Sequence, residues 1–395
     1  MTSMKPQDMK RFWTLDPEVT FLNHGSFGAC PRPVLDAQQV LRAEMEREPV
    51  AFLERRFEVL LDGAREALAE FVGCDAGGLV FVPNATTGVN AVLSSLELRP
   101  GDELLVTDQA YNACRNALDE TARRSRARVV VARVPFPLDS DEQVVESVLA
   151  AVTPATRVAL IDQIASITAL RFPVRRLVAA LAQRGVETLV DGAHAPGQIE
   201  LDLEGIGAAY YTGNCHKWLC APKGAAFLYV REDKRASVRP VVISHGANSP
   251  RRDRSRYQLE FGWAGTGDPT PYLSVPAAIE FMGSLLPGGW QALMARNRAL
   301  ALEARDILCR ALDMDAPCPD GMIGSMAAFP LADARAAPEP PLLLDSLHLE
   351  LIERYGIEAP VSYWPEYPRR VLRVSCQVYN HSDEYRRLAE ALARE

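Results

Sequence analysis

The stretch Thr212-Gly-Asn-Cys-His-Lys-Trp218 is the most informative part of this sequence, because it holds one of only five lysines in a chain with 38 arginines. Of these two cations, only lysine readily loses its proton and attacks a carbonyl carbon. Lys217 stands between a histidine and a tryptophan, and semi-apolar surroundings favour the neutral, nucleophilic amine. Lys217 is therefore a candidate for forming a Schiff base. A surface lysine beside a buried Trp218 would show the same pattern.

A second feature is the apolar run Leu189-Val-Asp-Gly-Ala-His194, which ends in a carboxylate. Asp191 stands at the carboxyl end of an expected strand, where ligands bind in open α/β sheets. An acid that holds a pyridinium nitrogen and a lysine that holds an aldehyde are the minimum that pyridoxal phosphate needs. We therefore predict this cofactor. Asp191 could instead cap the next turn, and His194 could contact the cofactor's ring hydroxyl or be a structural histidine.

Length and composition limit the class of protein. A chain of 395 residues is too long for one small core and predicts two domains. An apolar content of 48% and a charged content of 24% are typical of globular proteins. The net charge of −8 argues against nucleic-acid binding, so we expect no such partner. The eight cysteines form no C-x-x-C pair, which predicts neither a disulfide framework nor a metal site.

Residues 1–11 are polar and lack the apolar core of a signal peptide. No run reaches the roughly 18 apolar residues that a membrane span requires. We therefore expect a cytoplasmic protein without a membrane partner.

Short apolar strands alternate with helical segments up to about residue 231, which predicts an α/β fold with a mostly parallel sheet covered on both faces. The seven expected strands cover residues 79–82, 104–106, 129–131, 158–162, 188–190, 208–212 and 225–230. Later residues mix long helices with short strands. We predict an N-terminal segment over 1–29 that packs on the site, a large cofactor-binding domain over 30–275, and a small α+β domain over 276–395.

Several residues near these elements are candidates for binding a phosphate. Thr86 and Thr87 follow a strand and open a helix, whose N-terminus attracts anions and whose hydroxyls add donors. Both threonines could also be plain helix caps. Thr212 and His216 flank Lys217 closely enough in sequence to reach the same phosphate.

Two further residues are candidates for contacts with the ring and the substrate. Tyr111 follows a strand on a loop, where its ring could stack on a flat cofactor. Arg373 lies in the apolar run Val371-Leu-Arg-Val-Ser375, and a buried arginine needs a partner. A substrate carboxylate offers a bidentate partner, and a structural ion pair is the alternative.

Taken together, these motifs resemble the class V aminotransferases of pyridoxal-phosphate fold type I, in particular the branch similar to isopenicillin N epimerase. The resemblance extends almost from end to end. It includes Phe21-Leu-Asn-His-Gly-Ser-Phe-Gly28, Asn84-Ala-Thr-Thr-Gly88, Asp191-Gly-Ala-His194, His216-Lys-Trp218, Pro222-Lys-Gly224, Gly265-Thr-Gly-Asp268, Arg373-Val-Ser375 and Val378-Tyr-Asn380. It implies a large domain with a seven-stranded sheet and a smaller C-terminal domain.

The resemblance also implies a role for each matching position. Lys217 would bind the cofactor covalently and move the α-proton, Asp191 would pair with the pyridine nitrogen, and His194 would lie near the ring hydroxyl. The ring would stack on Tyr111, and the phosphate would be held by Thr86, Thr87, Thr212 and His216. Thr266 would reach the phosphate of the neighbouring subunit in a homodimer. Arg373 would bind the substrate α-carboxylate, with Asn23 and His24 lining the entrance.

The chain departs from some relatives at two places. Cysteine desulfurases of this class carry a nucleophilic cysteine in the region that matches residues 356–368, and this chain has none there. Gln163 replaces a histidine found in many relatives, which puts the transfer of a relative's substrate in doubt.

Three reactions at an amino acid remain open at this point. The resemblance implies epimerisation through a quinonoid, with C–S β-lyase activity on a cysteine conjugate, or transamination or oxidative deamination, as alternatives. A cofactor-fold protein that acts as a binding or regulatory module is the non-enzymatic alternative. It would predict a damaged set of site residues, whereas the set in this chain looks complete.

Overall fold

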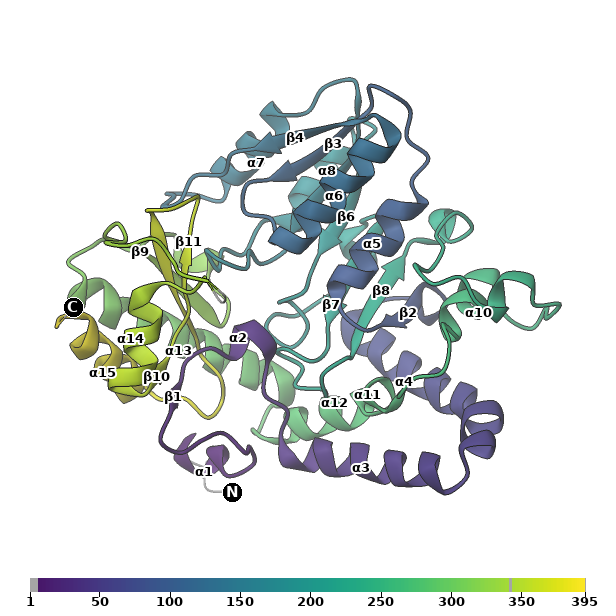
Figure 1. The fold of residues 1–395 in the computed structure, drawn as a ribbon, viewed down its shortest axis with the longest axis horizontal. Coiled ribbons are helices and arrows are strands. Elements are labelled where there is room, and N and C mark those ends of the chain that lie inside the picture. Colours follow the sequence, from purple (N-terminus) through teal and green to yellow (C-terminus); the bar gives the residue numbers. More distant parts are fainter. Residues whose placement is uncertain (1–5, 341–342, 395) are drawn as a thin grey trace.

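A seven-stranded sheet forms the centre of the computed structural model, which describes residues 6–340 and 343–394 (Figure 1). Its strands are β2 (Leu79–Val82), β3 (Glu103–Thr107), β4 (Arg128–Ala132), β5 (Thr156–Asp162), β6 (Glu187–Asp191), β7 (Tyr210–Asn214) and β8 (Ala226–Val230). The spatial order is β2-β8-β7-β6-β5-β3-β4, and β8 alone runs antiparallel to its neighbours. The predicted fold class, a mostly parallel sheet of seven strands, is confirmed.

Helices cover both faces of this sheet, which explains why its strands are almost continuously apolar. One face contacts α5 (Ala85–Ser95), α6 (Asn112–Ser125) and α10 (Arg256–Gly262). The other face contacts α4 (Phe57–Val72), α7 (Glu142–Ala150) and α8 (Val174–Ala182). Successive strand residues alternate between the faces, so Val158 and Leu160 pack beneath α5 and α6 while Ala159 and Ile161 pack on the opposite side.

The N-terminal part of the chain pairs with a strand from its C-terminal part. Strand β1 (Thr20–Phe21) pairs in parallel with β10 (Ile357–Glu358), and the short helix α2 (His24–Phe27) follows it. Figure 1 shows α2 between the large sheet and the C-terminal elements. The chain also forms α1 (Pro6–Lys10), α3 (Arg32–Arg47) and a π-helical turn over Ala51–Arg56 that leads into α4.

The C-terminal part pairs helices with a small antiparallel sheet of order β11-β12-β9. Its strands are β9 (Met326–Leu331), β11 (Val361–Tyr363) and β12 (Arg370–Ser375). Its helices are α12 (Val275–Ser284), α13 (Gly289–Ala311), α14 (Ser346–Tyr355) and α15 (Ser382–Leu392). Two single turns of helix, α9 (Leu203–Ile206) and α11 (Thr270–Leu273), lie in the connections before it.

Helix α12 contacts α3 and α4 as well as α13, and one hydrophobic cluster includes residues from both parts of the chain. The domain boundary at residues 275 and 276 therefore stays a prediction. In the described part of the chain, no helix combines the length and the apolar character that crossing a membrane requires.

Gly88 lets α5 lie directly on β7, which yields a stability prediction. A Cβ atom at position 88 would lie 2.3 Å from Thr212 Oγ1. We expect Gly88→Ala to lower the free energy of unfolding by about 1–3 kcal/mol, because α5 must move away from the sheet. The matched control is Gly63→Ala in α4, where the added methyl meets nothing within 4 Å and should stabilise by roughly 0.5–1 kcal/mol. Denaturant titration measures both changes, and equal midpoints for the two variants would contradict the prediction.

Candidate active site

The candidate site lies at the carboxyl edge of the central sheet. Asp162 ends β5, Asp191 ends β6, and Lys217 lies in the turn just after β7. These three strands are parallel, and Asp191 is in register with Asp162 on one side and with Thr212 on the other. The parallel register therefore brings groups that are far apart in sequence to one edge, as the position of Asp191 predicted.

Lys217 is partly buried in this site, and its Nζ atom lies 3.1 Å from His194 Nε2. Burial first, and then the positive charge of Arg373, lower the pKa of the Lys217 amine to about 7. Because desolvation disfavours the ammonium form, a large fraction of the amine is neutral at neutral pH. This is the form that attacks an aldehyde, so the alternative of an ordinary surface lysine is wrong.

The tautomer of His194 follows from its two neighbours. Trp218 Nε1–H can only donate a hydrogen bond, and it lies 3.4 Å from His194 Nδ1. Nδ1 is therefore the acceptor, so Nε2 carries the proton and donates to the lone pair of the neutral Lys217 amine. Burial, and next the charge of Lys217, hold the pKa of His194 well below its usual value, so the ring stays neutral.

Two hydrogen bonds orient the carboxylate of Asp191. The backbone N–H of Ala193 donates to Oδ1 at 3.0 Å, and the thiol of Cys114 on α6 donates to Oδ2 at 3.2 Å. Burial and the Asp191 charge raise the pKa of Cys114, so this thiol stays protonated. The sequence did not single out Cys114, because only the packing of α6 on the sheet brings it to Asp191.

Asp162 is a second carboxyl group that the sequence analysis did not identify. Its side chain is buried beside Asp191, and its Oδ2 atom has no hydrogen-bond partner among the described residues. Burial, followed by the negative charge of Asp191, raises the pKa of Asp162 well above the usual range. Asp162 therefore takes up a negative charge less readily than an exposed aspartate. The two-residue period of β5 could have revealed that Asp162 shares the face of Leu160.

The N-terminus of α5 and the turn after β7 form the expected phosphate corner. The N-cap Asn84 accepts hydrogen bonds from the backbone N–H and the hydroxyl of Thr87. The helix cap is therefore Asn84 and neither threonine, so the alternative that Thr86 and Thr87 are helix caps is wrong. Thr86 is half-buried at the same helix end. His216 Nδ1–H donates to the Ala225 carbonyl at 2.9 Å, and burial lowers its pKa to about 4. The other ring nitrogen of His216 remains for an anion, and it can donate only if that anion draws a proton onto the ring.

The structure does not favour Thr212 as a phosphate contact. Its side chain is fully buried beneath α5, and its hydroxyl donates to the Phe227 carbonyl at 2.8 Å. Asn214, two residues further along the same face of β7, lies at the strand end. Its Oδ1 accepts from the Ala85 N–H at 2.8 Å. The amide nitrogen of Asn214 is therefore the side-chain atom that remains to donate hydrogen bonds to a phosphate. Asn214 fits the role expected of Thr212, and the alternation of β7 is the signal that was missed.

Tyr111 and Thr266 occupy exposed positions. Tyr111 is the N-cap of α6 and is 49% exposed, so its ring is available for stacking. Thr266 lies in an exposed loop between α10 and α11. Its expected contact with the phosphate of a neighbouring subunit stays a prediction.

Arg373 on β12 is a buried cation whose contacts in the described chain are neutral oxygens. It donates to the Ser166 carbonyl, to Asn23 Oδ1 at 3.2 Å and to Ser26 Oγ at 2.8 Å. Burial lowers its pKa to about 10. The Arg373 Nε atom is buried without a partner, so a carboxylate would satisfy both the charge and the unused donor. Among the described residues Arg373 has no carboxylate partner, so the structure does not favour the alternative of a structural ion pair.

His24 lies beneath the lysine turn and does not line the entrance as expected. Its side chain has no exposed surface, and it hydrogen-bonds Tyr379 OH at 2.8 Å and the Lys217 carbonyl at 3.1 Å. Burial lowers its pKa to about 3, so the ring is neutral. This position supports the backbone of Lys217. Asn23, by contrast, reaches Arg373 directly.

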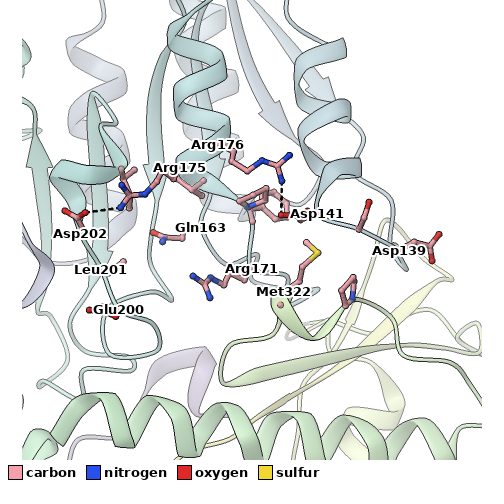
Figure 2. Close-up of a pocket in the computed structure, with 17 residues that line it drawn as sticks. Asp139, Asp141, Gln163, Arg171, Arg175, Arg176, Glu200, Leu201, Asp202 and Met322 are labelled. Atoms are coloured by element: carbon pink, nitrogen blue, oxygen red, sulfur yellow. Dashed lines mark hydrogen bonds and ion pairs between the residues drawn. The ribbon is translucent and has the colours of Figure 1, made fainter. Parts of the chain in front are cut away.

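Gln163 faces away from Lys217. It lies on the opposite side of β5 from Asp162, where its amide oxygen accepts from Tyr211 OH. It lines a cavity of about 890 Å³ with Arg171 and Glu200, shown in Figure 2. Gln163 therefore lies on this second face, and among the described residues its side chain has no hydrogen bond with Lys217.

The residues at the carboxyl edge fit pyridoxal phosphate. A neutral buried amine suits its aldehyde, the Asp191 carboxylate suits the pyridine nitrogen, and the end of α5 with Asn214 and His216 suits the phosphate. The partnerless Arg373 Nε suits an amino-acid carboxylate.

The fold and this site define a class V aminotransferase, and comparison with known proteins supports the assignment. A family model described as aminotransferase class-V matches residues 28–388. The chain belongs to this family and is a pyridoxal-phosphate-dependent enzyme. Isopenicillin N epimerase from Amycolatopsis lactamdurans is 40% identical over 395 residues, which cover 96% of this chain and 96% of that protein. The isopenicillin N epimerase of Streptomyces clavuligerus is 35% identical, with 96% and 95% covered.

Relatives with another activity also match. A probable L-cysteine desulfhydrase from Arabidopsis thaliana is 28% identical over 95% of this chain and 83% of that protein. Among solved structures, a cysteine desulfurase from Escherichia coli has a TM-score of 0.79 at 20% identity, with 100% of this chain and 98% of that chain covered. A cystine C–S lyase has a TM-score of 0.79 at 21% identity, with 95% and 98% covered. At these identities the two structures support the fold alone.

The lowered pKa of Lys217 yields a prediction for the cofactor-free protein. We expect the rate of borohydride-trapped attachment of pyridoxal to Lys217 to rise with pH and to reach half its plateau near pH 7. Below that pH the amine is protonated and cannot attack the aldehyde. Peptide mapping separates Lys217 from the other four lysines, and Lys217→Arg is the control that should leave this peptide untagged. A rate that reaches its plateau only above pH 9 would contradict the prediction.

Proposed function

We propose that this enzyme epimerises an amino acid at its α-carbon. The observation that carries the proposal is the match to two isopenicillin N epimerases over 96% of the chain. The site supports it, since epimerisation needs a base that is neutral at working pH and a clamp for the carboxylate. Lys217 and Arg373 have these properties.

Each proposed role follows from a contact of the residue concerned. The bound cofactor would supply the electron sink that stabilises negative charge at Cα. Asp191, oriented by Ala193 and Cys114, would keep a proton on the pyridine nitrogen. Lys217 Nζ would take the α-proton from one face of Cα, and inversion requires that a proton be added to the opposite face. Before the transfer, the His194 N–H would hold the Lys217 lone pair in place. Arg373 would fix the α-carboxylate, so that Cα keeps one position while a proton leaves one face and another is added to the opposite face.

C–S β-lyase activity is the second candidate, and the match to an L-cysteine desulfhydrase favours it. A persulfide on the enzyme is disfavoured, because residues 356–368 contain no cysteine and the Cys114 thiol is held protonated. A lyase reaction would therefore release the thiol directly from the substrate. Transamination and oxidative deamination use the same cofactor contacts and rank third.

We also propose that the enzyme is a homodimer whose subunits share the phosphate site. Large apolar side chains are exposed on the N-terminal helices, including Phe27 at 75%, Val40 at 69% and Val59 at 71%. Where exposed apolar side chains gather on one surface, they are typical of contacts between subunits. A partner's Thr266 could then reach the phosphate corner. A cytoplasmic location and a role in secondary metabolism belong to the same proposal.

An exchange experiment separates the two candidate reactions. With isopenicillin N in deuterated water, we expect deuterium at Cα and formation of the other epimer, followed by NMR and chiral chromatography. Lys217→Ala should lower this rate by about 100-fold or more, since it removes the proton carrier. Release of pyruvate and sulfide from L-cysteine, without any inversion of isopenicillin N, would establish the lyase and refute the epimerase.

Mixed dimers test the shared phosphate site. Thr266→Ala should weaken cofactor binding by about tenfold, the effect of losing one hydrogen bond to a charged group. If Thr266 acts across the interface, a dimer of one Thr266→Ala chain and one Lys217→Ala chain contains one fully native site. We therefore expect one tight, covalently loaded cofactor per mixed dimer, measured by titration and mass spectrometry. Weak binding at every covalent site would place Thr266 in its own subunit's site, against the proposal.

A further inference from the structure

A chain of hydrogen bonds leads from Arg373 away from the site to a carboxylate on another element. Arg373 Nη2 donates to Asn23 Oδ1 at 3.2 Å, and Asn23 Nδ2 donates to Glu358 Oε1 at 2.8 Å. The same Glu358 oxygen lies 3.2 Å from His348 Nε2 on α14. The chain thus connects the expected carboxylate clamp to a half-buried acid that no motif in the sequence singled out.

Glu358 determines which way the Asn23 amide points. An ionised carboxylate can only accept hydrogen bonds, so the amide nitrogen of Asn23 must face it. The amide oxygen must then face Arg373, where it also accepts from Ser26 Oγ at 2.6 Å. Without Glu358 the amide could rotate and place its N–H groups against the guanidinium, which has no acceptor.

This orientation controls which donors of Arg373 remain for a ligand. Asn23 and Ser26 engage Nη2, and the Ser166 carbonyl engages Nη1. These contacts hold the two Nη atoms at the end of the guanidinium. The buried Nε atom has no hydrogen-bond partner among the described residues. Arg373 is therefore rigid before any carboxylate arrives, which lowers the entropic cost of binding one.

The backbone holds Glu358 in place independently of the substrate. Glu358 is in register with Phe21 in the parallel β1–β10 pair, and its carbonyl accepts from the Leu22 N–H at 2.9 Å. Its hydrogen bond with His348 first, and that with Asn23 next, lower the pKa of Glu358 against the opposing effect of burial. The acid consequently stays ionised at neutral pH.

We propose that Glu358 is a positioning residue that acts through Asn23 to orient Arg373 and so makes the enzyme select ligands with a free α-carboxylate. The proposal rests on the proposed function, in which Arg373 binds that carboxylate. Glu358 itself touches neither the expected cofactor position nor the reacting atoms, and it differs in this respect from Lys217, Asp191 and Arg373.

The test compares two ligands that differ only in the carboxylate, L-alanine and ethylamine. Each is titrated into the enzyme loaded with pyridoxal phosphate, and binding is followed by the change in the visible spectrum. We expect Glu358→Ala to weaken L-alanine binding by about tenfold, the effect of disrupting one charge-assisted hydrogen bond, and to change ethylamine binding by less than about twofold. Cofactor affinity should stay at the wild-type value, because Glu358 makes no contact with that corner.

Two further variants keep the test decisive. Glu358→Gln should recover most of the L-alanine affinity, since its amide oxygen can still accept from Asn23. Glu353→Ala, an exposed acid on the neighbouring α14, should behave as wild type. Unchanged L-alanine binding in Glu358→Ala, or an equal loss for both ligands, would overturn the proposal. A wild-type protein that binds no pyridoxal phosphate at Lys217 would overturn the proposed function, and this assignment with it.

Discussion

The site depends on the burial of Lys217. A lysine in water is a cation and not a nucleophile, and desolvation is the largest cause of its lowered pKa. That burial is produced by the N-terminal residues, which cover the turn after β7. His24 hydrogen-bonds the Lys217 carbonyl, and a Cβ atom on Gly28 would lie 2.8 Å from the Lys217 Cα. A segment nearly 200 positions away in sequence therefore sets the chemistry of the amine.

Burial disfavours the charged form of most titratable side chains around Lys217. Burial lowers the pKa of His194, His216 and His24 and keeps these rings neutral, and burial beside Asp191 raises the pKa of Asp162. Arg373 is a buried cation held by neutral oxygens. An anionic cofactor and an amino-acid carboxylate would supply the compensating charges. Such an arrangement is costly without ligands and is typical of binding sites.

Much of the fold could be predicted from the sequence, since alternation between short apolar strands and helices is a local signal. All seven strands of the central sheet lie where the pattern indicates them, within a few residues. The short pair β1 and β10 was not predicted, because two residues carry no periodicity. For the same reason the link between Glu358 and Asn23 could not be seen, although it spans 335 positions.

The candidate site was predicted in part, and the predictions that the structure does not favour have a common cause. Motif position correctly indicated that Lys217, Asp191, His194 and Arg373 gather in one place. It did not indicate which side chains face the ligand, so Thr212 was chosen where the structure favours Asn214, and His24 was placed at the entrance when it lies beneath the lysine. The direction in which a side chain points depends on the alternation of its strand at the last residue and on the elements that pack over that residue.

The sequence by itself determined the family, the cofactor and the kind of sheet, because lysine, carboxylate and helix-opening motifs keep their chemistry and spacing wherever they occur. Only the tertiary structure decided the lowered pKa of Lys217, the raised pKa of Asp162 and the unused donor of Arg373. These properties depend on desolvation and on hydrogen bonds between residues hundreds of positions apart. Neither can be predicted from the residues adjacent in sequence.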